Sequence, residues 1–307
     1  MERLRIWRER ITAGESRDVK TEILGALEEL TKPDRARAYG LLVACCRHLG
    51  ETEEGLDFLA RGEALGVREA PACVELLAQG ASLLIHLGDA ERARAYLGRS
   101  LDIVEAELAK PEGSSNYSKQ RRAWFVRAKA RNLVLRGDLT HRLKDRPGRD
   151  ALRDAFAAIE VAKGFPREQA CGISLVCNVL AFHGGLAEVV SVLELTKELD
   201  EYLSRKRVPR NHPYKLRIRW ARAVALARLG MDERAESIMK EVADQLIRKG
   251  MTEDARMAVE TLLWMIGERS GEIGRARFTA AKYRKAIPEL EVPKLPEPVR
   301  KDAVRGW

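Results

Sequence analysis

The stretch LLIHLGDAERARAYLGRSL, residues 83–101, is the clearest structural signal in the chain. An apolar helix ends at Gly88, Asp89 follows, and a second amphipathic helix begins directly after it. Glycine tolerates the left-handed conformation that closes a helix, and aspartate accepts hydrogen bonds from the free N–H groups where a helix starts. The stretch therefore predicts two antiparallel helices joined by a tight turn. Gly137 and Asp138 repeat the pair, so we expect a turn and a cap there too.

The same glycine signal recurs along the chain. It occurs at Gly50, Gly88, Gly137, Gly184 and Gly230, at intervals of 38, 49, 47 and 46 residues. Such spacing is typical of an array in which each helical hairpin buries its apolar face against the next. We therefore predict an all-α solenoid of stacked antiparallel hairpins, with about 12–14 helices.

Composition supports a helical protein without a membrane span. Hydrophobic residues make up 45% and charged residues 33% of the chain, and no apolar run is long enough to cross a bilayer. Charges interrupt the N-terminal MERLRIWRERI, where a signal peptide needs an apolar run. The sequence therefore predicts a cytoplasmic protein with no membrane partner.

The five cysteines are odd in number and show no Cys-x-x-Cys spacing. Because they lie in apolar helical patterns, we expect reduced, mostly buried thiols. We predict no metal site and no cofactor.

The pattern divides the chain into four parts. Residues 1–35 are expected to supply helices that cap the stack, and residues 36–250 to form the repeats. A last hairpin is expected at 251–287. Residues 288–307 contain four prolines and are expected to be an extended tail.

Two segments carry a family resemblance. Residues 74–108 and 216–249, with their HLGDAERA and RLGMDERA turns, resemble tetratricopeptide repeats. The resemblance extends over about five hairpins, and the long units resemble the tetratricopeptide-like sensor domains of bacterial regulators. It implies that a partner peptide lies along the inner face of the first helix of each hairpin. Residues 1–30 offer only about two helices, too few for a helix-turn-helix DNA-binding domain before the repeats.

Helical spacing selects the residues that share this inner face. The predicted partner-binding residues are Trp124, Arg127, Arg131, Ser174, Asn178, Arg217, Trp220 and Arg228. Gln79, Ser82 and His86 form a secondary part of the same groove. Arginine forks bind carboxylates, and asparagine pairs with an extended peptide backbone. Core packing is the alternative role for the two tryptophans.

Positive charge is concentrated in two stretches. Residues 119–136 carry seven Lys or Arg and no acid, and residues 203–222 carry eight and no acid, within a net charge of +9. Without these fifteen bases the rest of the chain carries 40 bases and 46 acids, a balance of −6. The stretches indicate either a cationic groove for an anionic partner or a solvated face paired with neighbouring acids. The residues alone leave both interpretations open.

No catalytic motif is present, so we predict a protein that is not an enzyme. The phosphate-loop, zinc-helix and nucleophile-elbow patterns are absent. His48 and His86 lie near helix ends, where a histidine interacts favourably with the helix dipole. The main expectation is therefore a peptide-binding adaptor or regulatory sensor with a cationic groove for an acidic segment. Two alternatives stay open: a nucleic-acid-binding regulator that uses the same stretches, and a structural subunit that assembles with itself or with others.

Overall fold

The structure is a computed structural model that describes residues 2–111, 119–142, 147–288 and 290. In these ranges the chain forms fourteen α-helices and no strand. The helices are α1 Glu2–Ala13, α2 Ser16–Ala26, α3 Lys32–Leu49, α4 Thr52–Ala64, α5 Ala70–His86, α6 Ala90–Leu108, α7 Lys119–Arg142, α8 Pro147–Val161, α9 Pro166–His183, α10 Leu186–Arg205, α11 Pro213–Arg228, α12 Asp232–Arg248, α13 Thr252–Trp264 and α14 Ile273–Tyr283. A π-helical turn, Met265–Arg269, follows α13. No described helix is long and apolar enough to span a bilayer.

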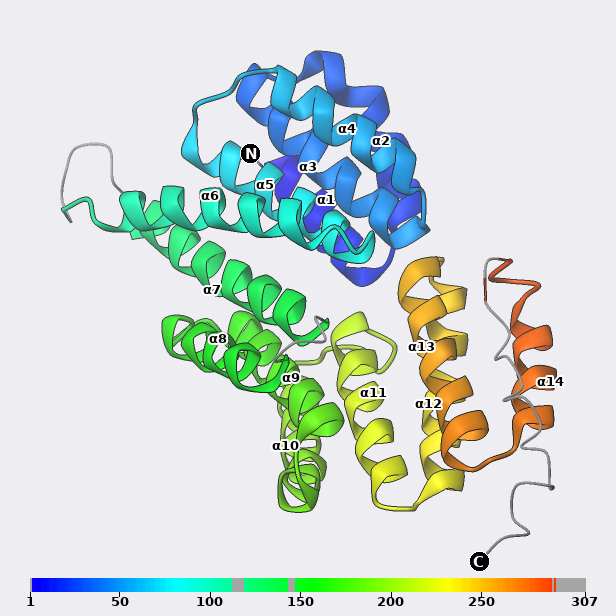
Figure 1. The fold of residues 1–307 in the computed structure, drawn as a ribbon. Coiled ribbons are helices and arrows are strands. Elements are labelled where there is room, and N and C mark those ends of the chain that lie inside the picture. The colour runs from blue at the N-terminus through cyan, green and yellow to red at the C-terminus, as the bar shows by residue number, and fades with distance from the viewer. Residues whose placement is uncertain (1, 112–118, 143–146, 289, 291–307) are drawn as a thin grey trace, which may run out of the picture.

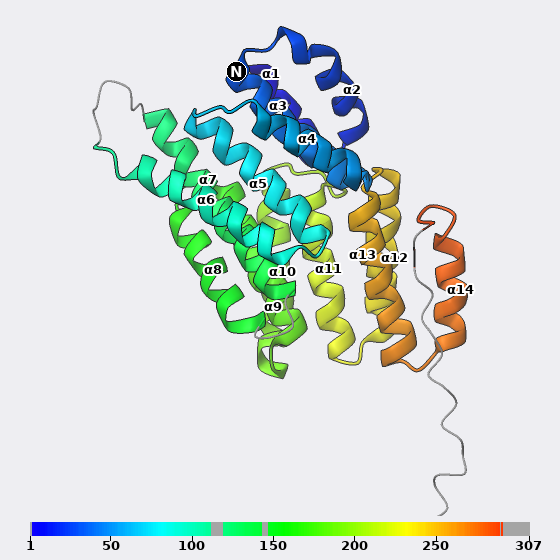
Figure 2. The ribbon, with the colours of Figure 1, turned by 45° about the horizontal axis from the view of Figure 1, so that its top comes forward.

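The helices are arranged as stacked hairpins that curve into a superhelix (Figure 1). Each of α3, α5, α7, α9 and α11 packs against the helix that follows it, and each of α3, α5, α7 and α9 also packs against the next first helix of the stack. The second helices, such as α4, α6 and α8, cover the outside of this curve (Figure 2). The predicted solenoid of antiparallel hairpins is thus confirmed.

The curve closes on itself. Helix α13 packs against α3, although the two helices are far apart in sequence. Beside this contact, the Lys249 ammonium donates a hydrogen bond to the Ala13 carbonyl oxygen at 2.8 Å, across 236 positions of sequence. The first helices therefore surround a central space that is still partly open to solvent.

Three of the five recurring glycines end helices as predicted. Gly50, Gly88 and Gly230 have φ values of 78°, 75° and 80°, in the left-handed region. Asp89 then caps α6 by accepting a hydrogen bond from the Arg92 N–H at 3.1 Å. Gly184 also follows a helix end, but its backbone is extended, with φ −68° and ψ 159°. Its position was predicted correctly and its left-handed conformation was not.

The prediction for Gly137 is wrong. Gly137 lies inside α7, which continues to Arg142, so Asp138 caps no helix. A Cβ atom at residue 137 would lie 3.2 Å from the Ala151 carbonyl oxygen and 2.6 Å from a Leu175 methyl carbon. The residue is glycine because α7 approaches α8 and α9 closely. A close helix contact and a helix end need the same residue type, which is why the sequence pattern misled us.

Two large apolar cores stabilise the two ends of the superhelix. One joins α1–α6 and includes Trp7, Leu42 and Leu84; the other joins α9–α14 and includes Leu226 and Met239. Smaller clusters connect them through α7 and α8. Helices α13 and α14 form the last described hairpin. Most of the tail expected at 288–307 lies outside the described residues.

A candidate ligand-binding cavity

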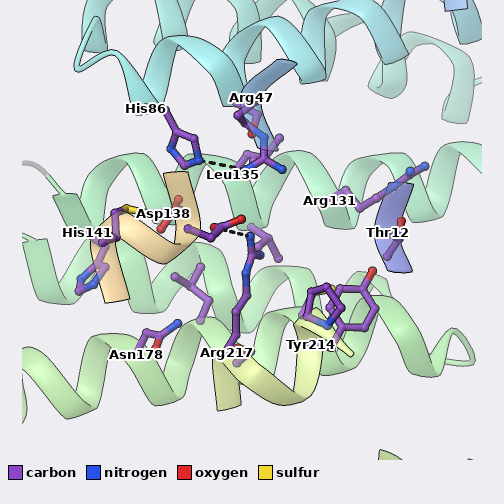
Figure 3. Close-up of a pocket in the computed structure, with 18 of the residues that line it drawn as sticks. Thr12, Arg47, His86, Arg131, Leu135, Asp138, His141, Asn178, Tyr214 and Arg217 are labelled. Carbon is purple, nitrogen blue, oxygen red and sulfur yellow. Dashed lines mark hydrogen bonds and ion pairs between the residues drawn. The ribbon is translucent and has the colours of Figure 1, made fainter. Parts of the chain in front are cut away.

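The superhelix encloses a cavity of about 780 Å³. Side chains from α1, α3, α5, α7, α9, α11 and α13 line it, together with Leu203 of α10. Figure 3 shows the cavity between α7 and α9, with Arg131, Leu135 and Asp138 along α7. The volume is within the range typical of sites that bind small molecules or short peptides. The first helices thus supply the inner surface that the sequence analysis assigned to them.

The cavity collects most of the residues predicted from helical spacing. Trp124, Arg131, Ser174, Asn178, Arg217 and Trp220 line it, as do Gln79, Ser82 and His86. Arg127 and Arg228 do not belong to its lining. The Arg127 guanidinium lies over the Phe165 ring at 5.7 Å, and Arg228 donates to the Ala181 carbonyl oxygen at 3.1 Å. Both side chains therefore contact neighbouring parts of the solenoid.

The two basic stretches contribute little to the cavity. Of their cationic side chains, Arg131 and Arg217 line it. Others form ion pairs with acids on adjacent helices, such as Arg136 with Asp154 at 2.8 Å. Among the described residues, four arginines and four carboxylates line the cavity, so its formal charges balance. Paired helix faces account for much of these stretches, so most of their bases do not reach the cavity.

Every carboxylate in the described lining has a guanidinium partner. Glu75 pairs with Arg8, with 2.9 Å from the Arg8 Nε to Oε1. Asp138 pairs with Arg142 at 3.2 Å. The remaining two pairs are Asp254 with Arg217 at 3.7 Å and Glu260 with Arg256 at 2.5 Å. These four acids are neutralised from within the protein.

Arg47 and Arg131 differ from the other arginines of the lining because neither forms an ion pair with any described residue. Arg131 donates through Nε to the carbonyl oxygen of Arg127, one turn earlier on α7, at 3.3 Å. Burial and the nearby charge of Arg8 lower the pKa of Arg131 from its ordinary value. A guanidinium remains charged even so, because its ordinary pKa is very high. Arg131 is therefore a cation of the cavity lining that forms no ion pair with a described carboxylate, although Glu75 and Glu168 attract it electrostatically (Figure 3).

Arg47 binds two imidazoles instead of an acid. Its Nη1 lies 2.9 Å from the Nε2 of His86, and its Nη2 contacts the Nε2 of His48. Burial and the Arg47 charge lower the pKa of His86 to about 3 and that of His48 well below its ordinary value. Both rings are therefore neutral acceptors at physiological pH and supply no counter-charge to Arg47. Asp254 attracts the Arg47 guanidinium electrostatically but forms no ion pair with it among the described residues.

Asp254 is ionised but incompletely bonded. Burial raises the pKa of this carboxyl, but the positive charges of Arg217 and Arg47 outweigh that effect and lower it. The side chain is buried, and its Oδ2 has no hydrogen-bond partner among the described residues. Two more buried atoms of the lining, Asn132 Oδ1 and Trp220 Nε1, also have no hydrogen-bond partner among the described residues. A buried polar atom costs free energy until it is paired, so these atoms favour a polar ligand.

One cluster outside the cavity has the residue types of a metal site. The ligand atoms of Cys46, Glu51 and Glu54 lie within 4.8 Å of one another. The Lys20 ammonium, however, donates to Glu51 at 2.6 Å and to Glu54 at 2.5 Å. Burial raises the pKa of Cys46 to about 12, so its thiol is protonated at neutral pH. The cluster is a half-buried lysine with two carboxylate partners.

Several residues of the cavity were missed from the sequence. Arg47, Asp138, Arg142 and Asp254 were not predicted to line it. A signal for two of them existed, because Arg131, Leu135, Asp138 and Arg142 follow one another at steps of four, three and four on α7. The expected helix end at Gly137 concealed that continuity. Arg47 and Asp254 had no comparable signal, since they meet only where the superhelix closes.

Comparisons with known proteins describe the fold. No protein-family model and no curated protein matches the chain. Among solved structures it resembles a Rap protein complexed with competence and sporulation factor, with a TM-score of 0.58 and 14% identity, over 92% of this chain and 75% of that one. It also resembles a signal transduction ATPase with numerous domains and a tetratricopeptide repeat sensor, from Pyrococcus horikoshii, with a TM-score of 0.47 and 16% identity, over 92% of this chain and 43% of that one. The fold is thus a tetratricopeptide-like helical solenoid.

Proposed function

We propose that this protein is a non-enzymatic peptide-binding regulator whose cavity accepts an acidic segment of a partner. The observation that carries this proposal is which charged side chains of the cavity lining have an ion-pair partner and which do not. Each lining carboxylate has a guanidinium from within the protein, whereas Arg47 and Arg131 have no carboxylate partner among the described residues. A ligand carboxylate supplies the missing counter-charge.

The energetic argument follows from burial. A guanidinium held away from bulk water loses hydration, and an isolated cation in such a place raises the free energy of the folded protein. A carboxylate that forms two parallel hydrogen bonds with it recovers much of that cost. The ligand-free cavity is therefore prepared for an anion without rearrangement of its own acids.

The rest of the lining fits a peptide. The amide side chains of Gln79 and Asn178 line the cavity, and an amide can pair with backbone N–H and C=O groups of a peptide. Trp124, Trp220 and Trp264 supply apolar surface for side chains. The Rap protein, whose structure is a complex with competence and sporulation factor, supports ligand binding by a solenoid of this shape. The proposal also includes the cytoplasmic location expected from the sequence.

The test is a binding measurement on the whole chain with synthetic pools of short peptides. Each pool containing Asp and Glu is matched by one in which Asn and Gln replace them. We expect the acidic pool to raise the melting temperature and to give binding heat, and the neutral pool to do neither. Equal binding of both pools would remove the proposal.

Two controls separate the alternatives. Single-stranded RNA and DNA oligomers are titrated at low salt, and binding that falls steeply as salt rises would favour the nucleic-acid alternative instead. Sedimentation of the chain alone tests self-assembly, and a concentration-dependent oligomer would favour the structural-subunit alternative. For the proposed function we expect neither behaviour.

A further inference from the structure

We infer that a carboxylate of the ligand binds between His86 and Arg142, where it accepts hydrogen bonds from the imidazole Nδ1–H and from the guanidinium. This inference rests on the proposed function, because it specifies where the acidic segment contacts the cavity. The position lies where the C-terminal ends of α5 and α7 approach each other, beside α3.

His86 lies between two guanidinium groups. Its Nε2 atom is 2.9 Å from Nη1 of Arg47, and its Nδ1 atom is 3.4 Å from Nη1 of Arg142. Figure 3 shows the first of these contacts, with the ring of His86 directed from α5 toward Arg47. Both nitrogen atoms of one imidazole therefore face hydrogen-bond donors.

A neutral imidazole cannot accept from both of these donors. One of its ring nitrogens accepts and the other carries a proton. The ring is neutral at physiological pH, because burial and the Arg47 charge keep the pKa of His86 at about 3. We assign acceptance to Nε2, which has the shorter contact, so Nδ1 carries the proton. The His86 Nδ1–H and the Arg142 N–H thus face each other, and a carboxylate oxygen beside them would accept from both.

A chain of hydrogen bonds holds His86 in this protonation state. The buried side chains of Ser16 and His48 are 2.9 Å apart, from Oγ to Nδ1, and Nε2 of His48 contacts Nη2 of Arg47. Because a guanidinium only donates, His48 accepts from it through Nε2 and gives its Nδ1–H to Ser16. Arg47 also donates to His86, and its charge polarises that ring and strengthens the Nδ1–H as a donor.

Arg142 can bind a ligand oxygen without losing its own carboxylate partner. Its Nε atom makes the ion pair with Asp138, whereas its Nη1 atom contacts His86 and the sulfur of Met257, a weak acceptor. The Arg142 side chain is 33% exposed, so a ligand can reach it. The ion pair with Asp138 therefore holds this arginine in place while leaving one edge for an anion.

The charges around this position leave room for one anion. Asp138 is paired with Arg142, and Asp254 is paired with Arg217. Arg47 forms no ion pair with a described residue, and its buried Nε has no hydrogen-bond partner among them. These three cations and two anions leave one positive charge, which a single carboxylate balances.

The first experiment uses acetate as the smallest carboxylate probe. The whole chain is labelled with nitrogen-15 at histidine, and acetate replaces chloride at constant ionic strength. We expect the His86 Nδ1 resonance to shift as acetate rises, and acetamide to have no such effect. Arg142→Gln should weaken this response about 10-fold or more, the usual effect of losing a hydrogen bond to a charged group. Lys129→Gln is the control, because this lysine pairs with Glu105 outside the cavity lining.

Peptides then identify the source of the carboxylate. The acidic and neutral pools of the proposed function are each made with a free and with an amidated C-terminus. We expect His86→Phe and Arg142→Gln to lose about 10-fold or more in affinity for the same pools. A loss confined to pools with a free terminus assigns the position to a C-terminal carboxylate. A loss for the acidic pools with either terminus assigns it to an Asp or Glu side chain.

The outcomes separate this inference from the proposed function. If the peptides bind both variants as well as the unaltered protein, or if acetate and acetamide act alike, the carboxylate position is wrong and peptide binding stands. If acetate acts through His86 and Arg142 but no pool binds, the proposed function fails and the carboxylate position stands. If His86→Phe does not fold, the acetate titration of the unaltered protein and of Arg142→Gln still decides.

Discussion

The hairpin α5–α6 and the hairpin α7–α8 show two uses of the same sequence signal. In the first, Gly88 has a left-handed backbone, the chain turns there, and Asp89 caps α6. In the second, Gly137 stays helical and α7 continues past it for five more residues. The same Gly-Asp pair therefore ends one helix and continues another.

This difference between the two hairpins determines which of their residues line the cavity. Because α7 does not end at Gly137, it carries Asp138, His141 and Arg142 into the cavity lining. Helix α5 ends at His86, which is the last cavity residue it supplies. Both hairpins therefore line the cavity, but α7 extends its share of the lining beyond the glycine, whereas α5 does not.

The largest expected effect concerns the close contact at Gly137. In Gly137→Val the added carbon atoms would collide with the Ala151 carbonyl oxygen and with Leu175. We expect the free energy of unfolding to fall by about 3 kcal/mol, as for severe overpacking of a core. Chemical denaturation followed by circular dichroism measures it. An unchanged stability would mean that α7 ends at this residue after all.

The second prediction compares two arginines four residues apart on α7. Arg131→Gln should weaken binding of an acidic peptide about 10- to 100-fold, because Arg131 lines the cavity. Arg127→Gln should leave the affinity within about twofold, since its guanidinium lies over Phe165 outside the lining. Isothermal titration of both variants with the same peptide checks this. A larger loss in Arg127→Gln would contradict the assignment of the cavity.

The third prediction concerns pH and His86. Its folded-state pKa, about 3, is below the ordinary value of 6.5. The unfolded chain therefore takes up a proton as the pH falls through 6.5, whereas the folded chain does not, so stability falls from there toward the folded-state pKa. We expect His86 to cause a loss of about 2 kcal/mol between pH 6.5 and about pH 4.5.

Denaturation curves at several pH values measure this loss. His86→Gln should reduce it. His183→Gln is the matched control, because His183 also ends a first helix but is exposed. An equal change of the pH profile in both variants would show that the position of His86 in the cavity has no influence.

The smallest expected effects compare two exposed glycines. Gly88→Ala places a side chain at φ 75° and should cost about 1 kcal/mol, although no atom lies within 4 Å of the added carbon. Gly98→Ala, inside α6 and also without a neighbour within 4 Å, should stabilise the protein by about 0.5–1 kcal/mol. Thermal melts of the two variants should therefore shift in opposite directions.

The sequence predicts well whatever local periodicity controls. The hairpins, the caps at Gly88 and Asp89, and the face that Trp124 and Arg131 share on α7 all follow from spacing along a helix. The face of α7 beyond Gly137 could also have been predicted from spacing. It was missed because Gly137 was assigned to a turn, whereas the close packing of α7 is what requires a glycine there.

The other residues depend on how far the superhelix curves. Arg47 and Asp254 lie in one site because α3 meets α13, and the angle between successive hairpins is the sum of many small packing contacts. Periodicity along one helix carries no information about that sum. The sequence also cannot predict which arginines of the cavity lack an ion-pair partner. Ion pairs between helices decide this, and they depend on the same curvature of the superhelix.

The contact between α13 and α3 also has a kinetic consequence. Most contacts in a repeat array join neighbours in the chain and form early in folding, because short loops lose little entropy. The hydrogen bond from Lys249 to Ala13 closes a loop of 236 positions. Thr12 and Asp254, which lie near the two ends of that loop, enter the same cavity only when it closes. A ribosome-bound chain that has not yet released α13 can therefore stack its first hairpins but cannot complete the cavity.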